Sequence, residues 1–279
     1  MTERLNIRRM QTPESEPKSG SFNIERDVNG EDWKAMDQEY KDLFKSGNLV
    51  TALELLYNMK TLDSTRPLPL GEGDLDALVR ESHRDKAQTD GRFIRLASYL
   101  YSIDPATGKL DENLAEPLNG LFPVSLLPPE GVGGWQSCLS WGTAARLLKP
   151  DWKSDHISSH YQELEVLLQD LLVKQQWGSF ISVASLARIA CPDVVIPHIG
   201  DAGWSAMRSL LRKYRVRAQS INTRAVSGTF HFAEYAAGMR ILAAGEVRIP
   251  ASGGLELVMH KPKADSQEPV PPQPQPLEL

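Results

Sequence analysis

Positive charge gathers in one segment of a chain that is acidic as a whole. The formal net charge is −5, yet residues 206–224, AMRSLLRKYRVRAQSINTR, contain no carboxylate. Their cations are Arg208, Arg212, Lys213, Arg215, Arg217 and Arg224. Three of the arginines stand at i, i+4 and i+7, so a helix would place them on one face. Like charges at this spacing repel by roughly 0.2–0.5 kcal/mol per pair, which indicates an anionic partner.

Phosphate is the anion that these side chains suit best, because the planar guanidinium fork matches its oxygens in a bidentate way. The sequence pI is near 5.7, so a polyanion would have to bind locally and not over the whole surface. A second interpretation stays open. Carboxylates from other parts of the fold would neutralise this helix face and leave it with a purely structural role.

Motifs for catalysis or metal binding are weak. The glycines of EGVGGW lack the spacing of a phosphate-binding loop. His156 and His160 have the four-residue spacing of zinc ligands, but HISSH lacks the glutamate of a metalloprotease, so surface histidines are the better interpretation. Cys191 and His198 flank prolines without an orienting partner. We therefore predict no enzyme, no metal, no cofactor and no small-molecule substrate.

Composition limits the broad class of protein. The chain has 279 residues, 41% of them hydrophobic and 24% charged, which is typical of an ordinary globular protein. It contains no run of 18 apolar residues, and its first 20 residues have no apolar segment, so neither a membrane span nor a secretory signal is predicted. Cys138 and Cys191 are too few for a disulfide framework, and we expect a reducing compartment.

Hydrophobic periodicity predicts a mainly α fold. Apolar residues recur at three and four positions over most of the chain, and breaks such as Ser-Gly-Asn and Pro192 separate the segments. The predicted helices are 32–44, 48–62, one beginning after Asp74, 90–103, 135–149, 155–176, 179–190, one opening at Gly203, and 230–245. Residues 246–261 alternate around a Ser-Gly-Gly turn, which predicts a short β-hairpin.

Two helical lobes with arms at both ends are the expected organisation. The N-terminal arm, 1–28, mixes Pro, Ser, Glu and Lys and is predicted to be disordered. A first helical lobe covers 29–116, and a Pro/Gly-rich linker at 117–134 separates it from a second lobe. The second lobe, 135–261, carries the basic helix and the hairpin. The Pro-rich tail, 262–279, is predicted to be disordered.

A family resemblance appears at the basic segment. SAMRSLLRKYR resembles the Leu-Arg-Gln-x-Cys-x-x-Tyr segment of flexible filamentous plant-virus coat proteins of the potexvirus and carlavirus type. Arg208 falls on the motif arginine, Leu211 on its cysteine and Tyr214 on its tyrosine. Upstream, FISVASLARIA resembles the Ile-Ser-x-x-x-Leu-Ala helix of that family. Downstream, TFHFAEYAAG resembles its Phe-Asp-Phe segment, with Phe230 and Phe232 as the two aromatics.

The resemblance implies a viral coat or nucleocapsid protein that packages single-stranded RNA in a helical oligomer, in the virion or the host cytoplasm. The implied RNA-binding residues are the six cations of residues 206–224 together with Phe230 and Phe232. The family pairs its motif arginine with an aspartate, and His231 stands there in this chain. We therefore expect Glu234 to pair with Arg208 in its place.

Two other functions remain open. VASLARIA and GWSAMRSLLRKYRV could form a helix-turn-helix with the hairpin as a wing, which would make a winged-helix-like DNA-binding protein, although the linker is long for that turn. A non-enzymatic oligomeric scaffold or adaptor is the third interpretation. In it the Leu-rich helix at 157–172 binds a partner and the Pro-rich tail recruits another.

Overall fold

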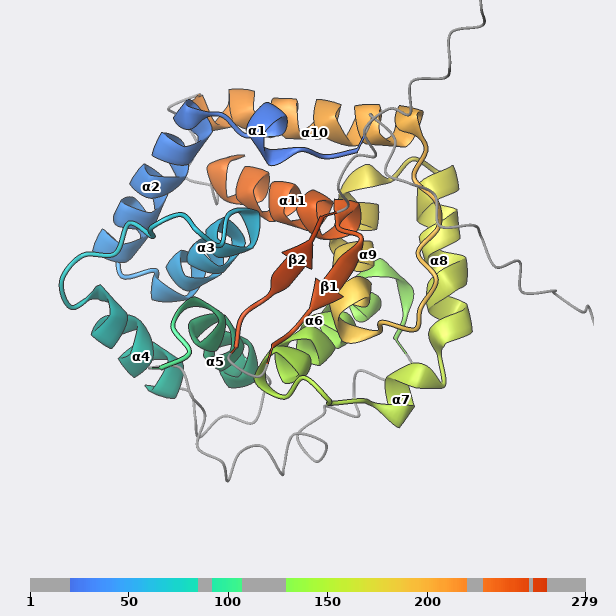
Figure 1. Ribbon diagram of the computed structural model, residues 1–279, viewed down its shortest axis with the longest axis horizontal. Coiled ribbons are helices and arrows are strands. Elements are labelled where there is room, and N and C mark those ends of the chain that lie inside the picture. Colours follow the sequence, from blue (N-terminus) through green and yellow to red (C-terminus); the bar gives the residue numbers. More distant parts are fainter. Residues whose placement is uncertain (1–20, 85–91, 107–128, 220–227, 251–252, 260–279) are drawn as a thin grey trace, which may run out of the picture.

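The fold is mainly helical, as the sequence predicts (Figure 1). The computed structural model describes residues 21–84, 92–106, 129–219, 228–250 and 253–259. Its helices are α1 Ile24–Asp27, α2 Gly30–Lys45, α3 Leu49–Leu62, α4 Asp74–Arg84, α5 Arg92–Ile103, α6 Gly131–Leu148, α7 Asp155–Ser158, α8 Tyr161–Val173, α9 Trp177–Ala190, α10 Asp201–Gln219 and α11 Gly228–Ala243. No helix of this part of the chain is long and apolar enough to cross a membrane.

The described N-terminal residues are packed into the body, which corrects the boundary predicted for the arm. Phe22 and Val28 are 2% and 4% exposed, and α1 lies between them. The Asn23 side chain caps α1 by accepting hydrogen bonds from the backbone of Glu25 and Arg26. Phe22 and Val28 belong to the hydrophobic core, and Ile24 between them packs against it. Residues 1–20 of the predicted arm lie outside the described residues, as does the predicted tail at 262–279.

Helix α2 begins at a capping box. The Asn29 side chain accepts from the backbone of Asp32, and the Asp32 carboxylate accepts from the backbone of Asn29 at 2.8 Å. Gly47, with a φ of 77°, ends the helix in a left-handed turn that a residue with a Cβ would adopt at a cost. The capping box fixes where the Asp32 carboxylate points.

The single helix predicted at 155–176 is wrong, because the chain breaks it into α7 and α8. Ser154 caps α7. The Ser158 and Ser159 hydroxyls then donate to the backbone carbonyls of Asp155 and His156, which competes with helical continuation. The helix starts again at Tyr161 and presents its apolar stripe to α9.

Helix α11 is the centre of the body. It packs against α2, α3, α9 and α10, while α6 packs against α5 and α9. Gly238 allows the closest approach, since a Cβ there would stand 2.6 Å from the side chain of Ile181 on α9. Buried residues from both sides of the predicted linker belong to one hydrophobic cluster. Of that linker, 131–134 form the first turn of α6, and 117–128 lie outside the described residues.

The predicted β-hairpin is confirmed. Strand β1, Glu246–Arg248, pairs antiparallel with β2, Glu256–Val258, and Val247 lies opposite Leu257. The turn lies at the C-terminal end of α5, where a Cβ on Gly253 would stand 2.8 Å from the Tyr101 ring (Figure 1). The hairpin therefore extends from the end of α11 toward α5.

Candidate nucleic-acid interface

Helix α10 carries the basic segment along one edge of the molecule (Figure 1). It is anchored by Met207 and Leu211, which are 0% and 3% exposed. Tyr214 adds ring contacts to α11, with centroid distances of 5.6 Å to His231 and 5.2 Å to Tyr235. The apolar face thus points into the body, and the described cations, Arg208, Arg212, Lys213 and Arg215, stand on the other faces of the helix.

A cavity of about 310 Å³ lies between α10 and the short helix α1. Four arginines line it, together with Leu211 and Asp27. The arginines are Arg26 of α1 and Arg208, Arg212 and Arg215 of α10. Guanidinium groups from two separate elements therefore converge on one space, which is the arrangement that a phosphate group would need. We call this space the arginine cavity.

Arg215 forms a bidentate ion pair with Asp32. Its Nε and one terminal nitrogen each donate to an Asp32 oxygen at 2.6 Å, and the terminal nitrogen also donates to the Asp27 carbonyl at 3.0 Å. The side chain of Asp32 is 5% exposed and that of Arg215 is 30% exposed. This pair joins α10 to the start of α2, so Arg215 has a structural role besides lining the cavity.

The charges of the cavity do not cancel. Arg26 donates to Asp27 at 2.9 Å and to the Ser21 carbonyl at 2.6 Å, which holds its guanidinium against α1. The hydrogen bond that Arg26 donates to the Asp27 carboxylate raises the pKa of Arg26, so it stays charged. Asp27 lines the cavity with the four arginines, and Asp32 pairs with Arg215 beside it, so the positive charges of these six side chains outnumber the negative ones by two.

The predicted cations have different places in the structure. Arg208 lines the cavity half-buried, and Arg212 lines it from an exposed position. Lys213 is exposed on α10 but does not line the cavity. The backbone of Arg217 belongs to the last turn of α10, whereas its side chain and the whole of Arg224 lie outside the described residues. At Arg215 the pair with Asp32 agrees with the second interpretation, in which carboxylates from other parts of the fold neutralise this helix face.

The two predicted aromatics lie on different faces of α11. Phe230 and Phe232 are two positions apart on α11, about 200° around its axis. Phe232 is 2% exposed and lies under Arg215, whose guanidinium carbon stands 5.4 Å from the ring centroid. It supports the arginine and has no surface to offer a base. Phe230 is half-buried and lines another cavity.

The structure does not bring Arg208 and Glu234 together, which corrects the predicted ion pair. Glu234 faces the same way as Phe230 and lines that other cavity, whereas Arg208 lines the arginine cavity. The Glu234 carboxylate contacts His231 of its own helix at 3.3 Å. Helical spacing explains why Glu234 does not reach Arg208. Phe230 and Glu234 are four positions apart and share one face of α11, whereas Phe232 occupies the opposite face, under Arg215.

The residues considered for catalysis or metal binding lie apart from the arginine cavity. His160 hydrogen-bonds to Glu163 one turn on. Both cysteines are buried and unoxidised, and burial raises the pKa of the Cys138 and Cys191 thiols to about 12. Neutral thiols are poor nucleophiles. No cluster of three or more histidine, cysteine, aspartate or glutamate side chains suited to a metal ion occurs within the described ranges.

Sequence reasoning missed Arg26, Asp27 and Asp32. The first two stand within the segment assigned to the disordered arm, where nothing marks a contact with α10. The capping-box spacing of Asn29 and Asp32 was the one available signal, and it locates a helix start without naming a partner.

A scan of the chain against family models, curated proteins and solved structures finds no match. The resemblance to filamentous coat proteins therefore stays a prediction carried by residues 180–238 alone.

Proposed function

We propose that the protein binds single-stranded RNA through the arginine cavity and the exposed face of α10. The observation that supports this most directly is the convergence of Arg26, Arg208, Arg212 and Arg215 on a space of about 310 Å³ with two excess positive charges. A charged phosphate would offset the repulsion among these guanidinium groups and accept bidentate hydrogen bonds from them.

Arg208 and Arg212 are the primary phosphate ligands of this proposal. Arg215 pairs with Asp32 and Arg26 with Asp27, and these two pairs set the position of the site. Arg208 and Arg212 line the space beside them, both from α10. Lys213, exposed on the same helix, extends the positive surface along a bound strand. Charge along one helix face suits a polyanion, whose phosphates repeat at a regular spacing.

Packaging of the RNA in a helical oligomer, in a virion or the host cytoplasm, is the wider proposal. It rests on the resemblance in residues 180–238 and not on the cavity. A helical coat needs an α-helical body, a local basic site and subunits that associate head to tail, and a net charge of −5 is compatible with a basic groove.

The position of the hairpin weighs against the winged-helix alternative. A wing flanks the recognition helix and reaches the DNA beside it. Here the turn of the hairpin packs on Tyr101 at the end of α5, while α10 lies along another edge (Figure 1). The scaffold alternative has one observation in its favour, because α8 exposes Val166 and Val173 on one face at 65% and 69%.

Binding of a single-stranded RNA oligonucleotide, measured by fluorescence anisotropy over a salt series, tests the site. Each phosphate contact contributes about 0.7 to the log–log salt slope, so Arg208→Ala with Arg212→Ala should flatten the slope by about 1.4. The matched control is Lys41→Ala with Lys45→Ala, which removes two exposed charges from α2. Equal losses in the two double variants would mean that RNA senses only net charge.

Electron microscopy of the protein with RNA tests the wider proposal. Filaments are the expected result, and they should be lost in the Arg208/Arg212 variant while the Lys41/Lys45 variant retains them. Monomers that bind RNA tightly without assembling would contradict packaging and leave the phosphate site intact.

A further inference from the structure

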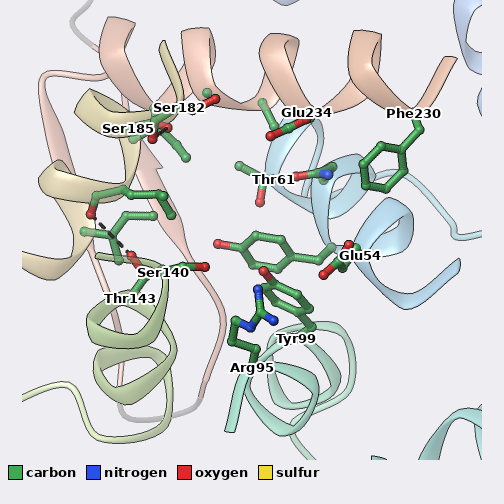
Figure 2. A pocket seen from close by; sticks show the side chains of 17 residues that line it. Glu54, Thr61, Arg95, Tyr99, Ser140, Thr143, Ser182, Ser185, Phe230 and Glu234 are labelled. Carbon is green, nitrogen blue, oxygen red and sulfur yellow. Dashed lines mark hydrogen bonds between the residues drawn. The ribbon is translucent and has the colours of Figure 1, made fainter. Parts of the chain in front are cut away.

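A second cavity of about 270 Å³ lies among five helices (Figure 2). Side chains of α3, α5, α6, α9 and α11 line it, whereas α2 and α10, which also pack against α11, do not. The lining combines apolar side chains with polar groups, including the hydroxyls of Thr61, Ser140 and Ser182. A concave space whose wall combines apolar surface with a few polar groups is typical of a small-molecule site. We call it the tyrosine cavity.

Aromatic rings form one wall of the tyrosine cavity. Tyr57 of α3 and Tyr99 of α5 are stacked, with centroids 4.6 Å apart and an interplanar angle of 26°. Phe230 of α11 lines the same space (Figure 2). Aromatic faces carry negative electrostatic potential and attract an organic cation within about 6 Å.

Carboxylates add to this preference. Glu54 of α3 and Glu234 of α11 line the cavity from different helices, and Arg95 of α5 is the one cation among its lining residues in the described structure (Figure 2). One negative charge is therefore in excess. Burial and then the Glu54 carboxylate raise the pKa of Tyr99 above its ordinary value, with Glu234 acting in the same direction. Both carboxylates thus act on the aromatic wall.

The Tyr57 hydroxyl supplies an independent sign of a missing ligand. Tyr57 lines the cavity and is 9% exposed. Its buried hydroxyl has no partner in hydrogen-bond geometry among the described residues, although the Thr61 hydroxyl one turn on is near enough to oppose the effect of burial on its pKa. A buried polar group without a partner costs about 1–3 kcal/mol, so such groups are uncommon. Burial raises the pKa of Tyr57 to about 12, and the neutral phenol keeps lone pairs that accept from an N–H donor.

We propose that the tyrosine cavity binds a small alkylammonium ion, with its charged nitrogen between the Glu54 and Glu234 carboxylates and its methylene chain against the Tyr57–Tyr99 stack. The ammonium donates to the carboxylates and to the Tyr57 hydroxyl. Phosphate-bearing ligands are disfavoured by the excess negative charge. This inference does not depend on RNA binding, because the arginine cavity shares none of these lining residues.

Calorimetric titration with putrescine, a four-carbon diamine, tests the proposal on the full chain. Putrescine should bind, and the neutral diol of the same length, 1,4-butanediol, should not. Glu234→Gln, a replacement of equal size at a half-exposed position, should weaken putrescine binding on the order of tenfold. Tyr57→Phe should weaken it by a smaller factor, because it removes one neutral acceptor and leaves the ring in place.

Glu72→Gln is the matched control, because it removes an exposed carboxylate ahead of α4 and should leave binding unchanged. An equal loss in the Glu72 and Glu234 variants would assign the binding to diffuse surface charge and overturn the proposal. Equal binding of the diol would overturn it too, since the cavity would then be selecting for an alkyl chain. Binding of Nα-acetyl-lysinamide in place of putrescine would keep the ammonium site and identify a lysine side chain as its source.

Discussion

The arginine cavity and the tyrosine cavity have similar sizes and opposite charge. The first has two positive charges in excess and lies at the edge, between α1 and α10. The second has one negative charge in excess and lies among the central helices. Helix α11 contributes to both regions, with Phe232 under Arg215 and Phe230 beside Glu234. A single helix can therefore serve two opposite electrostatic environments from its two faces.

Removing the aromatic under Arg215 should have the largest effect. Phe232 is 2% exposed, and Phe232→Ala should lower the free energy of unfolding by about 3–5 kcal/mol. Phe230→Ala, on the other face, should cost clearly less because Phe230 is only half-buried. Urea denaturation of the two variants makes the measurement. Equal costs would mean that the two faces of α11 are equivalent.

The ion pair at the arginine cavity should come next. Asp32→Ala leaves Arg215 without its carboxylate and removes half of the α2 capping box, so we expect a loss of about 2–3 kcal/mol, below that of a fully buried pair because Arg215 is 30% exposed. Asp32→Asn, which keeps a capping acceptor, should lose less. Lys41→Ala on the exposed face of α2 is the control, expected within about 0.5 kcal/mol. A small loss for Asp32→Ala would mean that solvent already screens the pair.

Basic pH should weaken the protein through its buried neutral groups. Burial raises the pKa of Cys138 and Cys191 from 9.0, and of Tyr57 from 10.0, to about 12. The unfolded chain therefore loses these protons first, and stability falls as pH rises above about 9, on the order of 1 kcal/mol per thiol at pH 10. Melting temperatures from pH 7 to 11 measure this. Replacing both cysteines by alanine should flatten the decline, and an unchanged decline would assign it to other groups.

Glu234→Ala should have the smallest effect on stability, within about 0.5 kcal/mol, because the Glu234 side chain is 41% exposed and its carboxylate lies 3.3 Å from the His231 ring nitrogen of the same helix. Thermal melts of Glu234→Ala, Arg208→Ala and the double variant should give additive effects. A large non-additive effect would mean that Arg208 and Glu234 interact after all, and it would contradict their separation into two cavities.

Local patterns were enough to predict several elements. The periodicity of residues 32–44 and 48–62 predicts α2 and α3, and the alternation around Ser-Gly-Gly predicts the hairpin. The helix predicted at 230–245 also implied that Phe230 and Phe232 lie on different faces, because residues two positions apart on a helix point in nearly opposite directions. The resemblance treated them as a pair and outweighed that geometry. The break at Ser159 depends on hydroxyl–backbone hydrogen bonds that periodicity does not register.

The sequence by itself determined that the chain is helical and that α10 has a basic face, because both follow from residue types at local spacing. Only the tertiary structure decided which of those cations have partners. Arg215 and Asp32 are 183 residues apart, and their contact follows from the packing of Phe22 and Val28 at the N-terminal segment. The tyrosine cavity likewise combines side chains from five helices. Such sites depend on how the helices are placed relative to one another. The hydrophobic pattern favours burial of the apolar faces, but burial is non-directional and does not specify which faces meet.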